Sequence, residues 1–232
     1  MIAEFYGLPG SGKSTQVNLM KEKFPEKIEL IVFSKKLFRK RNIRNIFSLE
    51  FIGFFFKLLR LWVVKITTMK TELFNKKSFR DEFKTAFYFA SLYLEFMYLR
   101  EHDSENKLYI VDHGLIQCLS SLVWDKKNVC EKSDSIINYI AEHFSQSVNY
   151  VYIAGCGAEE TYKRIMGRKW VIRLHSYSRD DGIGILNNLE NLFNKAQSVF
   201  KEKGRLLFID NSSGINEQHK KICDYYNLQV SE

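Results

Sequence analysis

Nine consecutive residues near the start of the chain carry a pattern that could bind phosphate. Residues 7–15 read Gly-Leu-Pro-Gly-Ser-Gly-Lys-Ser-Thr, which satisfies G-x-x-x-x-G-K-[ST] at every position. Glycines let the backbone curl until several N–H groups point at one anion, and a helix N-terminus adds unpaired N–H groups and a positive dipole end. The predicted phosphate-binding residues are Gly7, Pro9, Gly10, Ser11, Gly12, Lys13, Ser14 and Thr15.

Two residues of this loop give it its chemistry. Lys13 is placed to reach the β- and γ-phosphates of a nucleoside triphosphate, and the hydroxyl of Ser14 is placed to ligate Mg²⁺. The loop therefore predicts ATP and Mg²⁺ as cofactors, but it does not identify an acceptor. The alternative is a glycine-rich turn that binds nothing. The flanks argue against it, because residues 2–6 are β-like and residues 16–24 have helical apolar spacing.

Short apolar runs alternate with helical patterns along the chain, which predicts how these residues are positioned. Strands are expected at 2–6, 28–33, 108–111, 148–153 and 205–210. Five such alternations indicate an α/β fold, a three-layer sandwich with a five-stranded parallel sheet. Right-handed crossovers would bring the strand ends at Tyr6, Asp112 and Asp210 to one edge, where open α/β sheets bind ligands.

The absence of a linker-like segment predicts one domain over residues 1–232, with a helical, basic insertion at 35–105. The chain has only two prolines and no linker-like segment. Asp180-Asp181-Gly182 is expected to form a turn before a helix. The expected helices are 16–24, 115–124, 133–144, 158–167, 185–201 and 216–226.

Two aromatic stretches lie inside the insertion. Residues 51–64 are almost wholly apolar, but the run is short and is interrupted by Lys57 and Arg60. A membrane span needs about 20 apolar residues, so we expect a core helix. A membrane-surface helix or a homodimer contact is the alternative. Residues 80–100 predict a long helix whose aromatic residues belong to the core or line an acceptor pocket.

Charge and cysteine content limit the partners and the compartment. The net charge is +8, and residues 35–84 hold 14 Lys/Arg against 4 Asp/Glu, a local charge of +10. This segment could face a phosphorylated acceptor, nucleic acid or anionic lipid, or be a solvated lysine-rich surface. The four cysteines form no C-x-x-C pair, and no signal peptide is visible. Reduced thiols in a cytoplasmic protein are therefore expected.

The motifs together resemble the P-loop kinases of nucleosides and nucleoside monophosphates, in a thymidylate-kinase-like layout. The resemblance rests on the loop, on Val-Asp-His-Gly at 111–114, on the sequence from Glu160 to Arg168, and on Ile-Asp at 209–210. It covers residues 1–34 and 108–215. In such enzymes the segment that corresponds to residues 35–105 recognises the acceptor.

The resemblance implies further roles. Thr15 would contact the α-phosphate, and Asp112 would orient the acceptor, hold Mg²⁺ through water or accept a proton. Arg164 and Arg168 would form a basic lid that neutralises charge on the transferred group. Residues 211–214 would pass close to the donor base. Alternatively, Asp112 only caps the next helix and Arg164 is an ordinary surface arginine.

Departures from the family pattern leave the acceptor open. Residues 33–35 read Phe-Ser-Lys, without the acid that many nucleoside kinases carry there, and 112–114 read Asp-His-Gly where a thymidylate kinase has Asp-Arg-Tyr. The basic insertion favours an anionic acceptor such as a nucleoside monophosphate. The alternatives are a nucleotide-binding or membrane-surface module without turnover and a polynucleotide kinase. A GTPase switch is disfavoured, because no Asn-Lys-x-Asp motif occurs.

Overall fold

Five parallel strands form one sheet at the centre of the protein. The structure is a computed structural model, and it describes residues 1–32, 46–68, 76–102, 107–124, 133–167, 173–210 and 212–228. The strand order is β2-β3-β1-β4-β5. The strands are β1 (Ile2–Tyr6), β2 (Ile28–Val32), β3 (Leu108–Asp112), β4 (Val148–Ile153) and β5 (Leu206–Ile209). The predicted five-stranded parallel α/β sheet is confirmed.

The register brings the carboxyl ends of the strands to one edge. Ile2 of β1 pairs with Tyr109 of β3 and with Val148 of β4. Every residue of β1 and β4 is buried, as expected for central strands covered on both faces. The chain crosses the sheet in one direction from β1 to β2 and in the other from β2 through β3 and β4 to β5. Right-handed crossovers therefore place the connecting helices on opposite faces.

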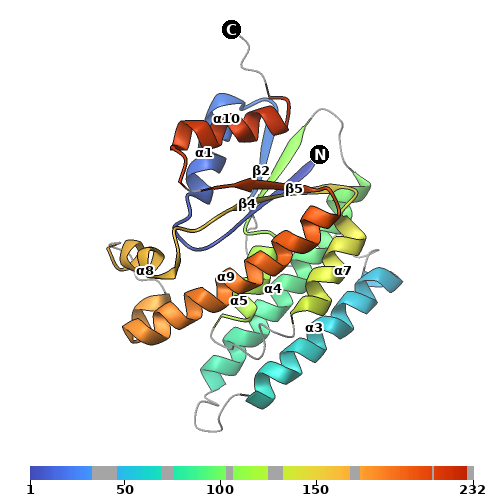
Figure 1. Cartoon of the computed structure of the whole chain (residues 1–232). Helices are drawn as coiled ribbons and strands as arrows, with labels where there is room; N and C mark the ends of the chain where they lie inside the picture. Colours follow the sequence, from blue (N-terminus) through green and yellow to red (C-terminus); the bar gives the residue numbers. More distant parts are fainter. Residues whose placement is uncertain are drawn as a thin grey trace.

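Helices cover both faces, which gives three layers (Figure 1). One face carries α1 (Lys13–Lys23) and α10 (Ile215–Tyr225), whose side chains pack on Ala3 and Phe5 of β1. The other face packs on Ile2 and Tyr6 of the same strand. Its helices are α4 (Lys76–Glu101), α5 (Leu115–Leu122), α7 (Asp134–Phe144) and α9 (Arg179–Glu202). A shorter helix, α8 (Ala158–Met166), follows β4, and a 3₁₀ turn spans Arg173–Ser176.

Helix α3 (Leu49–Thr68) packs outside this second helical layer, beside α4 and α7 (Figure 1). Phe54 stacks on Tyr93 of α4 with ring centroids 3.9 Å apart. The Glu50 carboxylate accepts two hydrogen bonds of 2.9 Å from Arg100 of α4, and the Glu50 backbone carbonyl accepts one of 2.8 Å from Tyr139 of α7.

No helix among the described residues is long and apolar enough to span a membrane.

Two expectations about helices need correction. Helix α3 buries Phe51, Phe54, Leu58 and Leu61, but its outward side is exposed, so the expected core helix is right for one face only. Residues 180–182 are not a turn, because α9 begins at Arg179. The Ser178 hydroxyl caps this helix: it accepts a hydrogen bond from the Asp181 N–H at 3.2 Å and donates one of 2.6 Å to the Asp181 carboxylate.

Candidate functional site

The phosphate-binding loop connects β1 to α1 at the carboxyl edge of the sheet. Its glycines Gly7, Gly10 and Gly12 have φ values of 148°, 86° and 94°, a region that side chains disfavour. A Cβ atom on Gly7 would also collide with the carbonyl oxygen of Ile153 in β4. Ser11 closes the turn through a 3.1 Å hydrogen bond from its N–H to the Leu8 carbonyl. The three glycines are therefore required by the path of the loop.

The ammonium group of Lys13 lies inside the curl of this loop. It donates hydrogen bonds to the carbonyls of Gly7 at 2.9 Å and Leu8 at 2.8 Å, and to the hydroxyl of Ser11 at 3.4 Å. The loop thus holds a cation at the point where it meets the helix. A positive charge beside backbone N–H groups suits an anion with several oxygens, such as a polyphosphate.

The N-terminus of α1 lies at the end of this loop. Gly12 is its N-cap residue and supplies no capping side chain. Helical hydrogen bonding begins with the Gln16 N–H, which donates to the Gly12 carbonyl at 3.1 Å. The side chains of Ser14 and Thr15 are exposed on the first turn. The first turn therefore presents hydroxyl groups and a positive dipole end beside Lys13.

Asp112 is the last residue of β3, which lies next to β1. Its position therefore places it at the same edge as the loop, as the strand pattern predicted. The side chain of Asp112 lies outside the described part of the structure, so its role stays a prediction. His113 follows with a φ of 62°, a left-handed conformation that turns the chain into α5.

A buried carboxyl group, Glu4, connects β1 to α5. Its Oε1 accepts hydrogen bonds from the N–H groups of Ile116 at 2.6 Å and Gln117 at 3.3 Å, at the N-terminus of the helix. Within the described part of the chain, its Oε2 has no hydrogen-bond partner. Burial raises the pKa of Glu4 from 4.5 to about 8, and the backbone hydrogen bonds oppose this shift only in part.

Gln117 links the loop to a polar cavity. Its Oε1 accepts a 3.3 Å hydrogen bond from the Gly7 N–H. The cavity has a volume of about 350 Å³ and lies between α4 and α5. Its lining residues are Lys84, Thr85, Tyr88, His113, Gln117, Cys118 and Ser121. A second molecule bound there would lie beside the end of β3 and next to the phosphate-binding loop.

Glu4 and Gln117 belong to no sequence motif. The only signal for Glu4 was an acidic residue in an otherwise apolar strand directly before the loop. No sequence feature points to Gln117, because its contact with Gly7 joins residues 110 positions apart.

Of the two predicted lid arginines, the structure describes Arg164. Arg164 is exposed on α8 and forms an ion pair with Glu160 of the same helix at 3.3 Å. Helix α8 follows the end of β4, close to the loop: a Cβ atom on Gly155 would come within 2.7 Å of Leu8. In this arrangement Arg164 pairs within its own helix. Arg168 lies outside the described residues.

The loop after β5 is held against α1. The Asp210 carboxylate accepts hydrogen bonds from the Ser212 N–H at 3.0 Å and its hydroxyl at 2.7 Å, which lower the pKa of Asp210. Gln16 of α1 donates to the Ile215 carbonyl and to Gln218, both at 3.1 Å. Described residues 212–214 therefore lie next to α1, and the predicted contact with a donor base stays a prediction.

No family model and no curated protein matches this sequence. The structure is similar to that of deoxyadenosine kinase from M. mycoides with bound dATP, with 13% identity, a TM-score of 0.53, and 98% of this chain and 100% of that chain covered. It is also similar to YorR protein from Bacillus subtilis in complex with phosphorylated GDP, with 13% identity, a TM-score of 0.51, and 98% and 96% covered. The chain has the fold of the P-loop nucleotide and nucleoside kinases.

Proposed function

We propose that this protein is an ATP- and Mg²⁺-dependent phosphotransferase that moves the γ-phosphoryl group to a small anionic acceptor, such as a nucleoside monophosphate. One observation carries the proposal. The loop that encloses the Lys13 ammonium group opens at the same sheet edge as the polar cavity between α4 and α5, and Gln117 touches both. A donor site and an acceptor site next to each other are what direct phosphoryl transfer needs.

The donor phosphates would bind across the loop and the first turn of α1. Lys13 would pair with the β- and γ-phosphates, Thr15 would contact the α-phosphate, and Ser14 with Asp112 would hold Mg²⁺. The exposed hydroxyl of Ser14 and the position of Asp112 at the end of β3 fit an ion shared with substrate phosphates. A Mg²⁺ ion held by these residues would neutralise phosphate charge.

The acceptor would bind in the cavity between α4 and α5. Lys84 and Tyr88 line it from α4, which belongs to the predicted insertion 35–105. Lys84 gives this cavity a cation, which supports an anionic acceptor. Asp112 would orient the acceptor hydroxyl or phosphate and accept its proton. Arg164, released from Glu160, and Arg168 would neutralise charge on the transferred group.

A transfer assay with γ-labelled ATP and Mg²⁺ tests the proposal. The acceptors are nucleoside monophosphates, nucleosides, phosphorylated sugars and short oligonucleotides. Nucleosides belong in the panel because one structure of the same fold is a deoxyadenosine kinase. Label on a nucleoside monophosphate, absent with the Lys13→Ala variant, supports the proposal. ATP binding without transfer to any acceptor contradicts it and favours a nucleotide-binding module.

A further inference from the structure

Gln117 lies at the junction between the polar cavity and the phosphate-binding loop. It belongs to the first turn of α5, is buried, and lines the cavity. Its Oε1 accepts a 3.3 Å hydrogen bond from the Gly7 N–H, and its Nε2 donates one of 3.3 Å to the Ser120 hydroxyl. Both ends of the side-chain amide are therefore bonded, which fixes the direction in which the oxygen points.

Gly7 connects Gln117 to the cation of the loop. Its N–H meets Gln117, and its carbonyl accepts a 2.9 Å hydrogen bond from the Lys13 ammonium group. A Cβ atom on Gly7 would collide with the carbonyl oxygen of Ile153, so the backbone here lies directly against β4. Two successive hydrogen bonds thus join the wall of the cavity to the group that is predicted to hold the β- and γ-phosphates.

The backbone of Gln117 is itself anchored to the central strand of the sheet. The Oε1 atom of Glu4 accepts hydrogen bonds from the N–H groups of Ile116 at 2.6 Å and Gln117 at 3.3 Å. Glu4 belongs to β1 and is fully buried. The first turn of α5 therefore cannot move relative to β1 without breaking these bonds. Such support from a second layer of contacts is what holds a functional group in a precise position.

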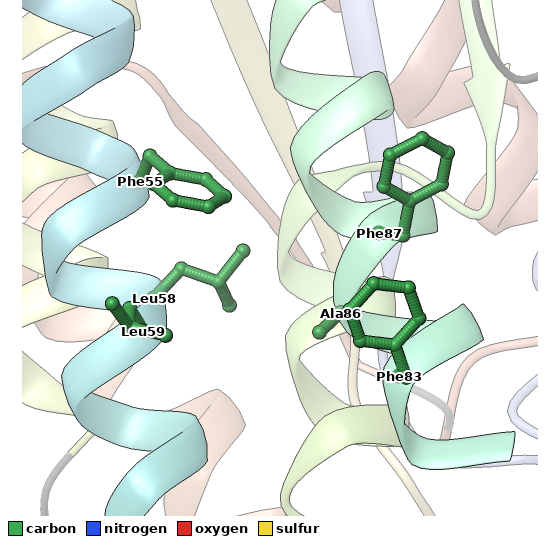
Figure 2. Close-up of a pocket in the computed structure, with 6 residues that line it drawn as sticks. All are labelled: Phe55, Leu58, Leu59, Phe83, Ala86 and Phe87. Carbon is green, nitrogen blue, oxygen red and sulfur yellow. The ribbon is translucent and has the colours of Figure 1, made fainter. Parts of the chain in front are cut away.

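The opposite wall of the cavity, formed by α4, has less support. Lys84 and Tyr88 line the cavity, whereas Phe83 and Phe87 of the same turns line an apolar groove between α3 and α4 (Figure 2). The groove has a volume of about 230 Å³, so this part of α4 has open space on a second side. The fixed relation between the cavity and the loop therefore comes from α5, through Gln117.

We infer that Gln117 is a positioning residue for phosphoryl transfer, which holds the Gly7 N–H and so fixes the donor loop relative to a molecule in the cavity. This inference rests on the proposed function. Transfer requires the γ-phosphoryl group and the accepting oxygen to meet in line, and a displacement of about 1 Å can lower the rate about 10²-fold. Gln117 would act through Gly7 and not on the reacting atoms.

Hydrogen exchange of the Gly7 amide, measured by NMR without any substrate, tests the contact. Gln117→Met keeps the length of the side chain but has no oxygen, so this amide should exchange about 3- to 10-fold faster than in the wild type. The rate is compared with that of Val151 in β4, which reports global unfolding. Gln146→Met, in the exposed turn before β4, is the matched control and should leave the rate unchanged.

A second variant keeps the test valid if Gln117→Met does not fold. Gln117→Glu retains an oxygen of the same reach, so exchange at Gly7 should stay within about twofold of the wild-type rate. Its carboxylate would face the donor phosphates, so the KM for ATP should rise. Faster exchange in Gln117→Glu, or wild-type exchange in Gln117→Met, overturns the inference.

Steady-state kinetics with Mg²⁺·ATP and the acceptor that takes label in the transfer assay tests the consequence. For Gln117→Met we expect kcat to fall about 10- to 100-fold while the KM for the acceptor stays within about twofold. Gln146→Met should keep both wild-type values. An unchanged kcat, with or without a higher acceptor KM, overturns the inference but leaves the proposed function intact. Absence of transfer by the wild type overturns both.

Discussion

In the proposed function, Lys13 is the residue on which nucleotide binding would depend most directly. Its ammonium group is held within 2.9 Å of two loop carbonyls, inside the curl where a phosphate would bind, and it would exchange one of these partners for a phosphate oxygen. We expect Lys13→Ala to weaken Mg²⁺·ATP binding by about 10- to 100-fold, the loss of a charge-assisted hydrogen bond. Isothermal titration calorimetry measures it. Lys23→Ala, at the exposed end of α1, should bind ATP as the wild type does.

Substitution of Asp112 would distinguish a role in ATP binding from a role in phosphoryl transfer. We expect Asp112→Asn to keep ATP affinity within a factor of a few and to lower kcat by about 10²–10⁴, because an amide cannot accept the acceptor's proton. Steady-state kinetics with the identified acceptor measures this. An unchanged kcat would mean that the residue only caps the helix that follows β3.

Glu4 makes stability depend on pH. Its carboxyl ionises near pH 4.5 in the unfolded chain but only near pH 8 in the folded protein. The unfolded chain therefore loses this proton first, and the contribution of Glu4 to stability is fully present only below pH 4.5. It should fall by up to about 1.4 kcal/mol per pH unit from there toward pH 8.

Glu4→Gln removes this titration and keeps an oxygen for the N–H groups of Ile116 and Gln117. Urea unfolding at several pH values should show a flatter profile for Glu4→Gln than for the wild type. The exposed control Glu26→Gln should follow the wild type. Parallel wild-type and Glu4→Gln profiles would show that Glu4 is ionised in the fold.

At the residue scale, the sequence predicted the groups that belong to a local motif. Residues 7–15 form the expected loop because glycine spacing and a following helix are local properties. Glu4 and Gln117 could not be predicted, since their importance comes from contacts that β1 and the loop after it make with α5, more than 100 residues away.

At the scale of elements, the start of α5 depends on space left by one glycine. A Cβ atom on Gly114 would collide with the Glu4 side chain, including a contact of 2.6 Å with Oε2. We expect Gly114→Ala to lower the free energy of unfolding by about 1–3 kcal/mol through overpacking.

The matched control is Gly184→Ala in α9, where a Cβ atom would meet nothing within 4 Å. This substitution should raise the free energy of unfolding by about 0.5–1 kcal/mol, since alanine favours the helix. Urea denaturation measures both variants. Equal stability of Gly114→Ala and the wild type would show that Glu4 can move aside.

The start of a helix can be predicted from the sequence when its capping residues are recognised. Helix α9 starts six residues before the expected Ile185 because Ser178 and Asp181 form a capping pair, a signal present in the sequence. The exposed side of α3 is different. Residues 51–64 are apolar on nearly every side, so periodicity alone could not tell which side faces the core.

At the scale of the molecule, the alternation of strands and helices predicted a parallel sheet but not the order of its strands. The order β2-β3-β1-β4-β5 depends on which strands pair across the fold. This order places β3 beside β1, and thus the end of β3 beside the phosphate-binding loop. The cavity between α4 and α5 also arises only in the fold, from residues as distant as Lys84 and Gln117.

The transfer of the γ-phosphoryl group of ATP to an acceptor tests the central claim most directly. We expect label from Mg²⁺·ATP to appear on a nucleoside monophosphate or a related anionic metabolite, at a rate at least about 10²-fold higher for the wild type than for Lys13→Ala. Lys23→Ala should keep the wild-type rate. Equal transfer by the wild type and Lys13→Ala, or no transfer to any acceptor class by a protein that binds ATP, would contradict the account.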